Sequence, residues 1–345
     1  MATSQLVQTS RLAIHCLIAG PEDAPAVVLV HGNISTGRFF GAVIESLARR
    51  FRVIAPDMRG FGDSEPKPID ATRGLRDFSD DLHALLAALK LEEPVNLVGW
   101  SVGGGIVLQY AIDHADRVAR VVLEAPMSPF GFGGTRDLQG TPCQPDFAGS
   151  GGGTANPEFV RLMAAGDRSA DAPVSPRSVM RGTFVHPQNQ LGAGEDELLG
   201  ELLKTKIGDD HYPGDLTTSP NWPGVAPGTR GMNNAISPKY VNLNGLPGIE
   251  PKPPILWIRG ADDVIVSDTS LFDFGYLGRL GVIPGWPGEE VCPPQPMIGQ
   301  MRALLDAYRD RGGQYEEVVL AETGHSPHLE RPADYVAALE KFLAG

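Results

Sequence analysis

Cysteine is scarce in this chain of 345 residues. The three cysteines, Cys16, Cys143 and Cys292, are far apart, and none belongs to a CxxC pair of the kind that zinc sites and redox motifs use. None follows a recognisable turn with an activating group nearby, which argues against a catalytic thiol. We therefore expect free thiols, with neither a metal nor a cofactor.

Basic residues and long apolar runs are also in short supply. The chain has 29 Lys and Arg against 42 Asp and Glu, a formal net charge of -13. Nucleic acids and anionic membranes attract clustered positive charge, so we expect neither as a partner. No basic region followed by a long apolar stretch begins the sequence, and no run of about 18 apolar residues occurs. These absences favour a cytoplasmic protein and leave its oligomeric state open.

The chain is rich instead in alternating strand-like and helix-like segments. Apolar runs predict strands at 11–17, 26–30, 51–56, 94–100, 118–126, 254–260 and 314–325. Helical spacing of apolar residues predicts helices at 39–50, 75–90, 102–115, 298–311 and 334–344. Repeated strand–helix–strand units predict an α/β fold with a mostly parallel, doubly wound sheet, and 42% hydrophobic residues suffice for its core.

The pattern is interrupted between the fifth and sixth of these strand runs. Residues 126–253 are rich in Gly and Pro, which indicates loops, so we expect core segments 1–125 and 254–345 with an inserted, loop-rich cap domain between them. The insertion carries more apolar bulk than a disordered tether needs. Its large apolar side chains include Phe130, Phe132, Phe147, Phe159, Met163, Met180, Phe184, Tyr212, Trp222 and Met232.

Ser101 lies in the string GWSVGG, between the predicted strand 94–100 and the predicted helix 102–115. Small residues on both sides let a strand and a helix approach closely at a strained turn. The amide groups at the start of the helix point toward any negative oxygen formed at the serine. This context predicts a nucleophile elbow with Ser101 as the nucleophile.

A serine nucleophile needs a base and a carboxylate that orients the base. His325 follows the last predicted strand and is the preferred base, with His328 as the competing candidate. Asp263, just after the strand 254–260, is the preferred carboxylate, while Glu124 and Asp262 remain alternatives. His31 belongs to the HG turn. The other histidines have no partnering motif and are expected to be structural or solvated: His15, His83, His114, His186 and His211.

The stretch HGNIST directly follows the predicted strand 26–30. A backbone N–H from such a loop can bind an oxyanion together with the amide that follows the nucleophile. These amides belong to Asn33 and Val102, although HGN as a simple tight turn stays open. The stretch MRGFGDS has neither the dinucleotide-binding nor the Walker spacing, which argues against a nucleotide site.

In this order, HGNIS, DMRGFGDS, GWSVGG, RGADDVIV and GHSPHLERP closely resemble the α/β-hydrolase family. The order Ser101, Asp263, His325 is the one that the family uses. HGNIST also looks like the loop of haloalkane dehalogenases, and the position of the cap suits epoxide hydrolases, but those relatives attack with an aspartate at the elbow. Residues 126–253, and the long stretch between 254–260 and the next helix, depart from the family and leave the pocket undefined.

With a serine at the elbow, the resemblance implies hydrolysis of a small-molecule carboxylic ester or lactone through an acyl-enzyme. The cap would favour a bulky, weakly polar substrate. Hydrolysis of a carbon–carbon bond or an amide, and cofactor-free perhydrolysis, are alternatives for the same triad. A protein of this fold that binds small molecules without turnover is the alternative from another functional class.

Overall fold

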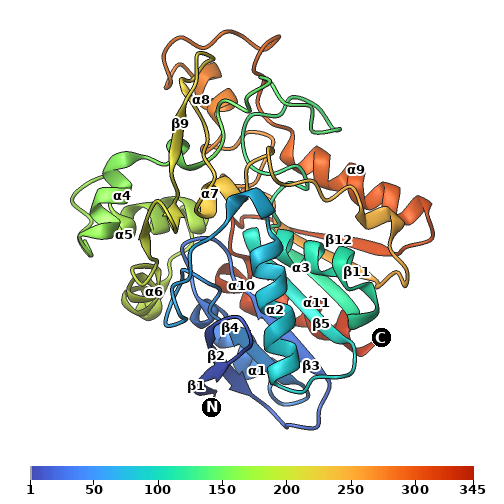
Figure 1. Cartoon of the computed structure of the whole chain (residues 1–345). Helices are drawn as coiled ribbons and strands as arrows, with labels where there is room; N and C mark the ends of the chain where they lie inside the picture. Colours follow the sequence, from blue (N-terminus) through green and yellow to red (C-terminus); the bar gives the residue numbers. More distant parts are fainter. Residues whose placement is uncertain (1) are drawn as a thin grey trace.

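A single eight-stranded sheet forms the centre of the computed structural model, which describes residues 2–345 (Figure 1). Neighbouring strands follow the order β1-β2-β4-β3-β5-β6-β11-β12. Pairing is parallel from β4 to β12 and antiparallel for β1 with β2 and β2 with β4. The strands are β1 Thr3–Gln8, β2 Ala13–Ala19, β3 Ala26–Val30, β4 Arg52–Pro56, β5 Val95–Trp100, β6 Val118–Glu124, β11 Ile255–Gly260 and β12 Tyr315–Leu320.

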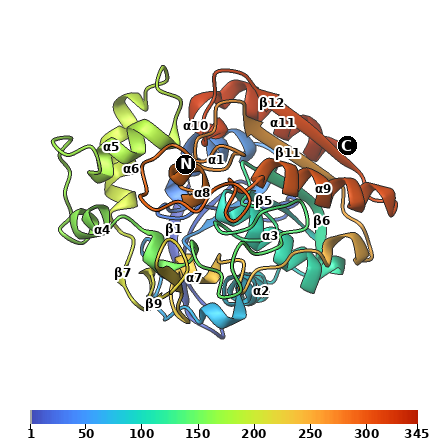
Figure 2. The same cartoon turned by 90° about the horizontal axis from the view of Figure 1, so that it is seen from above.

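Helices cover both faces of this sheet. The views in Figures 1 and 2 put α1 and α11 on one face, and α2, α3 and α9 on the other. Every residue of β3 and β5 is buried, as continuous apolar strands require when both faces are covered. The helices are α1 Gly41–Leu47, α2 Arg76–Ala88, α3 Val102–Asp113, α8 Phe274–Arg279, α9 Met297–Asp310, α10 Pro327–Glu330 and α11 Pro332–Ala344.

The α/β fold with a mostly parallel sheet is confirmed. The sequence analysis missed β1, which runs antiparallel at the edge of the sheet. Its residues TSQLVQ are nearly all exposed, so the strand lacks the apolar run by which the buried strands were found. Backbone pairing with β2, rather than burial of side chains, gives this segment its extended form.

The intervening segment, residues 126–253, consists mainly of loops with short elements between β6 and β11. Its apolar side chains join the same buried cluster as those of the sheet, including Met163, Met180, Phe184 and Leu199. Its elements are α4 Pro157–Ala164, α5 Pro176–Val179, α6 Glu195–Leu202, α7 Met232–Ala235, β7 Ile207–Gly208, β8 Tyr212–Pro213, β9 Leu216–Thr218 and β10 Val225–Pro227.

A second irregular stretch separates β11 from α9 and contains α8. It packs against the intervening segment, because the Trp222 indole N–H donates to the carbonyl of Pro284 across 2.9 Å. Trp222 also contacts the ring of Phe274 at the start of α8. The two departures from the regular fold therefore contact each other, and Figure 1 shows β9 and α8 side by side at the top of the view.

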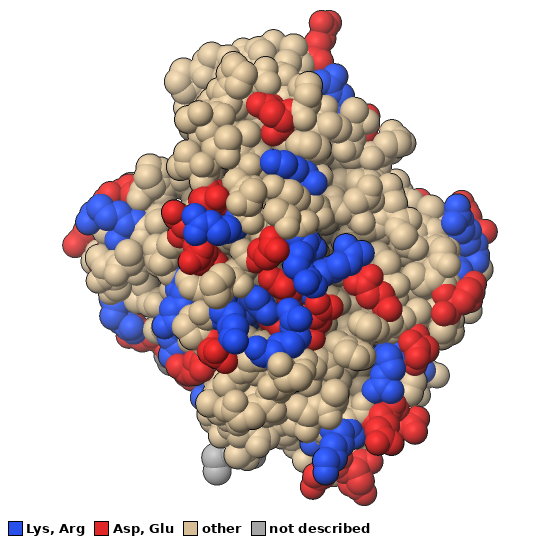
Figure 3. Space-filling model, in the orientation of Figure 1, with Lys and Arg blue, Asp and Glu red and all other residues tan. Residues whose placement is uncertain are grey.

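Acidic and basic side chains are interspersed over the face shown in Figure 3. Ion pairs also lie beneath the surface: buried Arg59 binds Asp77 and Asp81, and Asp81 also accepts from Arg11. None of the helices in residues 2–345 combines the length and the apolar character that a membrane crossing requires.

Candidate active site

Ser101 occupies the turn between β5 and α3 with φ 57° and ψ -119°, in the positive-φ region that side-chain-bearing residues rarely adopt. Its amide donates to the carbonyl of Glu124, and its carbonyl accepts from the amide of Met127, so β6 holds the turn. A Cβ on Gly99 would lie 2.3 Å from the carbonyl oxygen of Gly103, which explains the small residues flanking the serine. The local sequence thus forms a strained elbow of the kind that exposes a nucleophile.

His325 and Asp263 meet at the carboxyl ends of β12 and β11. The Nδ1 atom of His325 lies 2.8 Å from Oδ2 of Asp263, and both side chains are almost fully buried. The other carboxylate oxygen, Oδ1, accepts from the amides of Ile265 and Val266. Asp263 is therefore fixed from one side while it binds the imidazole on the other, which leaves Nε2 of His325 to exchange a proton.

Trp100 connects the elbow to this histidine. Its indole N–H donates to the carbonyl oxygen of His325 across 2.8 Å, and the two rings lie 5.7 Å apart. Among residues 2–345, no hydrogen bond joins the hydroxyl of Ser101 to the imidazole. Catalytic hydrogen bonds often tighten only when substrate binds. In the protein without substrate, the bond from Trp100 to the His325 carbonyl links the elbow to the histidine loop.

The two rival residues, Glu124 and His328, pair with each other. Oε1 of Glu124 accepts from both the amide and Nδ1 of His328, at 2.9 and 2.7 Å, and both side chains are buried. Because its hydrogen-bonded oxygen faces His328, Glu124 is not the partner of His325. Asp262 is exposed to solvent. Neither alternative carboxylate is hydrogen-bonded to the His325 ring in the described residues, where Nδ1 binds Asp263.

The HGN loop lies directly against the elbow. A Cβ on Gly32 would sit 3.0 Å from Cβ of Ser101. His31 fixes this loop, since its Nδ1 donates to the carbonyl of Gly32 and its Nε2 accepts from the amide of Met58. Burial lowers the pKa of His31, in keeping with a neutral ring that donates at one nitrogen and accepts at the other.

The amides of Asn33 and Val102 belong to this loop and to the first turn of α3. Within the described residues, neither amide donates to another protein oxygen. The Asn33 side chain points to the intervening segment, where its Nδ2 donates to Oδ1 of Asn233 on α7 across 3.2 Å.

The intervening segment also packs on the elbow through an aromatic contact. The Phe184 ring lies 5.9 Å from the Trp100 ring, edge to face, and 6.3 Å from Phe39. Ser101 itself is 8% exposed. Sequence reasoning identified the apolar bulk of this segment but not which of its rings reach the site, because that depends on long-range packing.

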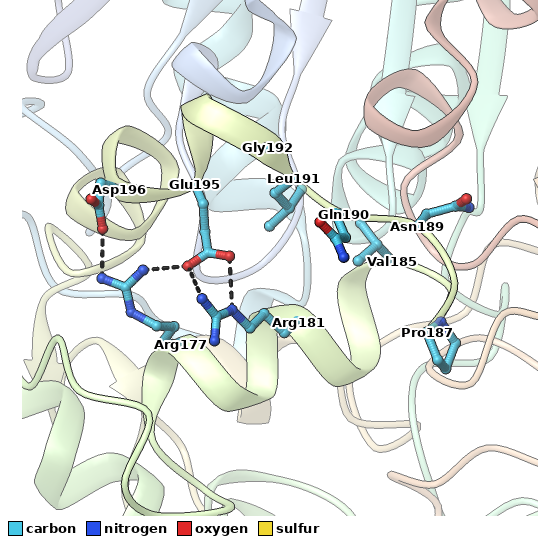
Figure 4. Close-up of a pocket in the computed structure, with 10 residues that line it drawn as sticks. All are labelled: Arg177, Arg181, Val185, Pro187, Asn189, Gln190, Leu191, Gly192, Glu195 and Asp196. Atoms are coloured by element: carbon cyan, nitrogen blue, oxygen red, sulfur yellow. Dashed lines mark hydrogen bonds and ion pairs between the residues drawn. The ribbon is translucent and has the colours of Figure 1, made fainter.

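A pocket of about 770 Å³ opens in the intervening segment, between α5 and the loop that precedes α6 (Figure 4). Arg177 and Arg181 converge there on Glu195, and Arg177 also binds Asp196. The hydrogen bond from Arg181 lowers the pKa of the Glu195 carboxyl. The charges of this pocket thus neutralise one another, and its lining contains neither the serine nor the histidine of the candidate site.

Two further groups of titratable side chains lie among the described residues. Cys143 and Cys292 are buried free thiols from the two irregular stretches, and the neighbouring Cys292 thiol lowers the pKa of Cys143. His15, Asp57 and Asp63 offer ligand atoms within 4.8 Å of one another. Asp57 already accepts from the His15 ring and from two amides, so this group forms a structural hydrogen-bond cluster.

Comparison with known proteins matches residues 25–150 to the family described as alpha/beta hydrolase fold. The 2-hydroxymuconate semialdehyde hydrolase of Pseudomonas sp. (strain CF600) is 42% identical over 100 residues, which are 28% of this chain and 35% of that protein. The match thus spans about a third of that relative's length. Epoxide hydrolase A of Mycobacterium tuberculosis is 27% identical over an alignment that covers 99% of this chain and 98% of that protein.

Among solved structures, a putative aryl esterase from Burkholderia cenocepacia superimposes with a TM-score of 0.62 at 20% identity, over 99% of this chain and 98% of that one. This likeness concerns the fold. Together with the sheet order and the family match over residues 25–150, it shows that the chain has the α/β-hydrolase fold.

Proposed function

We propose that this protein is a serine hydrolase that cleaves a carboxylic ester or lactone of a bulky, weakly polar small molecule. The observation that carries the proposal is the buried 2.8 Å contact between His325 and Asp263, anchored through Trp100 to the strained turn at Ser101. A base with an orienting carboxylate beside an elbow serine is the arrangement that acyl transfer needs.

In the proposed mechanism, the hydroxyl oxygen of Ser101 attacks the carbonyl carbon of the substrate and its proton passes to Nε2 of His325. Asp263 stabilises the imidazolium through Nδ1. The amides of Asn33 and Val102 donate to the oxygen that becomes negative. The tetrahedral intermediate collapses as His325 gives its proton to the leaving alkoxide oxygen. Water, deprotonated by the same histidine, then adds to the acyl carbon. The bond to Ser101 breaks as His325 returns the proton to the serine oxygen, and the acid is released.

The intervening segment, in this proposal, is a cap over the serine. Ser101 is only 8% exposed, the Phe184 ring packs on Trp100, and Asn233 bonds the Asn33 side chain. These three observations support a cap, because they put the segment against the elbow and against the oxyanion loop. Aromatic and aliphatic side chains from it would then line an apolar acyl or alcohol pocket.

The first test uses a fluorophosphonate probe, which reacts with activated serines, and a panel of p-nitrophenyl esters. We expect the parent protein to be labelled and to hydrolyse bulky esters faster than acetate. Ser101→Ala should fold normally, resist labelling and lose hydrolysis by several orders of magnitude, because the attacking atom is gone. A variant that keeps more than about a hundredth of the parental rate contradicts a serine nucleophile.

A second candidate is hydrolysis of a carbon–carbon or amide bond, or perhydrolysis, by the same triad. The local similarity to 2-hydroxymuconate semialdehyde hydrolase favours including a non-ester substrate in the panel. Labelling of Ser101 without turnover of any ester supports this candidate. Absence of both labelling and turnover, with retained binding of apolar small molecules, supports a binding protein instead.

A further inference from the structure

The carboxylate of Glu330 binds two segments that are far apart in the sequence. Oε1 accepts from the amides of Gly324 and Ser326, at 2.9 and 3.3 Å. Oε2 accepts from the amide of His186 and from Nδ2 of Asn189, both at 2.7 Å. All four donors are neutral N–H groups, two from the loop of the last strand and two from the intervening segment.

The first pair of donors brackets His325 in the chain. The one-turn helix α10 brings the Glu330 side chain back to this loop, since the amides of Leu329 and Glu330 bond the carbonyl of Ser326. The Glu330 carboxylate thus fixes the backbone on both sides of the imidazole. Within the described residues, Glu330 makes no hydrogen bond or ion pair with the imidazole, so its bonds act on the position of the ring.

The backbone of the intervening segment packs directly against the loop that carries His325. A Cβ on Gly324 would lie 2.8 Å from the amide nitrogen of His186 and 2.9 Å from the carbonyl carbon of Val185. Only a glycine lets the two backbones come this close. Asn189 adds a second bond to the loop, from Nδ2 to the carbonyl of Glu322 across 2.9 Å.

The segment that Glu330 holds is continuous with the ring that packs on the elbow. Phe184, two residues before His186, contacts the Trp100 ring, and Trp100 donates to the carbonyl of His325. Residues 184–189 are therefore linked to the loop of the proposed base by two routes, one through Glu330 and one through Trp100. A shift of this segment would be transmitted to the base through two independent contacts.

We propose that Glu330 is a positioning residue that couples residues 184–189 to the loop of His325, so that the seating of this segment sets the place of the imidazole relative to Ser101. This inference rests on the proposed serine hydrolase function. A base displaced by about 1 Å can cost a large part of the rate, which makes such coupling measurable.

The test compares Glu330→Gln and Asn189→Ala with the parent and with Glu316→Gln, a control at an exposed glutamate of β12. In Glu330→Gln the side-chain carbonyl still accepts from Gly324, but its NH₂ group meets the donors of residues 186 and 189. Hydrolysis is measured per active site, titrated with the fluorophosphonate probe, so that a partly unfolded sample does not lower the value.

We expect kcat per active site to fall about tenfold in Glu330→Gln and less in Asn189→Ala, with KM within about threefold and Tm within a few degrees. The double variant should lose less than the product of the single losses, because both changes release the same segment. The value of kcat per active site should fall further in Glu330→Ala than in Glu330→Gln, because alanine also removes the acceptor of the Gly324 amide.

An unchanged kcat per active site in Glu330→Gln, or losses that multiply in the double variant, overturns the coupling. A merely structural role would lower Tm and the fraction of active sites while leaving kcat per site at the parental value. These results are separable from failure of the proposed function itself, in which the parent protein would not be labelled at Ser101 at all.

Discussion

The indole N–H of Trp100 donates to the main-chain carbonyl of His325 across 2.8 Å. The residue before the proposed nucleophile thus holds the backbone of the proposed base. Trp100 is almost completely buried, so no water replaces this bond. The relative placement of serine and histidine therefore depends on a side chain that takes no part in the chemistry.

Replacing Trp100 with Phe should slow hydrolysis more than its loss of volume explains. The buried His325 carbonyl would lose its hydrogen-bond donor, which costs about 1–3 kcal/mol of unfolding free energy. The loop that carries His325 would then be free to move. We expect kcat to fall about tenfold in steady-state assays. Trp257→Phe is the matched control, because Trp257 is equally buried and its indole N–H has no partner among the described residues. Equal losses of kcat in both variants would argue against the anchoring role.

Asp263→Asn should lower kcat by a factor of hundreds or more. Because Oδ1 accepts from two amides, the new NH₂ group would take the place of Oδ2 and face the His325 ring. The ring would then carry its proton on Nε2, where it cannot accept the proton of Ser101. A pre-steady-state burst assay measures the loss at acylation.

Glu124→Gln should act on stability instead of turnover. Its carboxylate accepts twice from His328 in a fully buried setting, so the change should cost about 1–3 kcal/mol of unfolding free energy. We expect kcat within a few-fold of the parent, with a lower midpoint in urea. A ranking in which Glu124→Gln is slower than Asp263→Asn would move the triad carboxylate to β6.

Phe184→Leu should change substrate selectivity. The ring packs on Trp100 from the proposed cap, and a smaller side chain leaves a gap near the serine. We expect the ratio of kcat/KM for a bulky ester over acetate to fall several-fold. Phe159→Leu is the control, since Phe159 is a buried ring of the same segment that contacts Tyr212 instead. A ratio that moves equally in both variants contradicts a specific role for Phe184.

His15→Gln should reduce stability in a pH-dependent way. The hydrogen bond that His15 donates to Asp57 raises the pKa of His15. Burial opposes ionisation of Asp57, but the bonds it accepts from His15 and from amides outweigh burial and lower its pKa. The raised pKa contributes stability that is complete below the ordinary histidine value and is lost as pH rises through the raised one. The lowered pKa of Asp57 contributes stability that is lost only as pH falls through its depressed value.

The pair is therefore most stabilising between the ordinary values of Asp and His, around pH 5. At that pH we expect the variant to lose about 1–2 kcal/mol of unfolding free energy in urea titrations, as for a hydrogen bond to a charged group. The difference should shrink at pH 9, where the ring is neutral in both states. A loss that does not depend on pH would show that packing, not charge, explains the role of His15.

The sequence by itself determined the order and type of the core elements and the turn that presents Ser101. These follow from local causes: buried parallel strands need apolar runs, the helices need a 3.6-residue period, and the strained turn needs small neighbours such as Gly99. Chain order also favoured a base after the last strand and a carboxylate after the strand before it, while Glu124, at the end of an earlier strand, stayed an alternative. The exposed edge strand β1 was not predicted, because it is held by backbone pairing with β2 and has no buried apolar run.

Only the tertiary structure decided which partners meet. In the sequence, Glu124 and Asp263 both follow a strand that reaches the same edge, and the two histidines lie three residues apart. The one-turn helix α10 turns His328 toward Glu124 and leaves His325 facing Asp263. Glu330 also accepts hydrogen bonds from residues 186 and 189, which lie more than a hundred residues earlier in the chain. No pattern in the local sequence predicts these bonds. Such contacts arise from packing among distant segments, which residue periodicity does not encode.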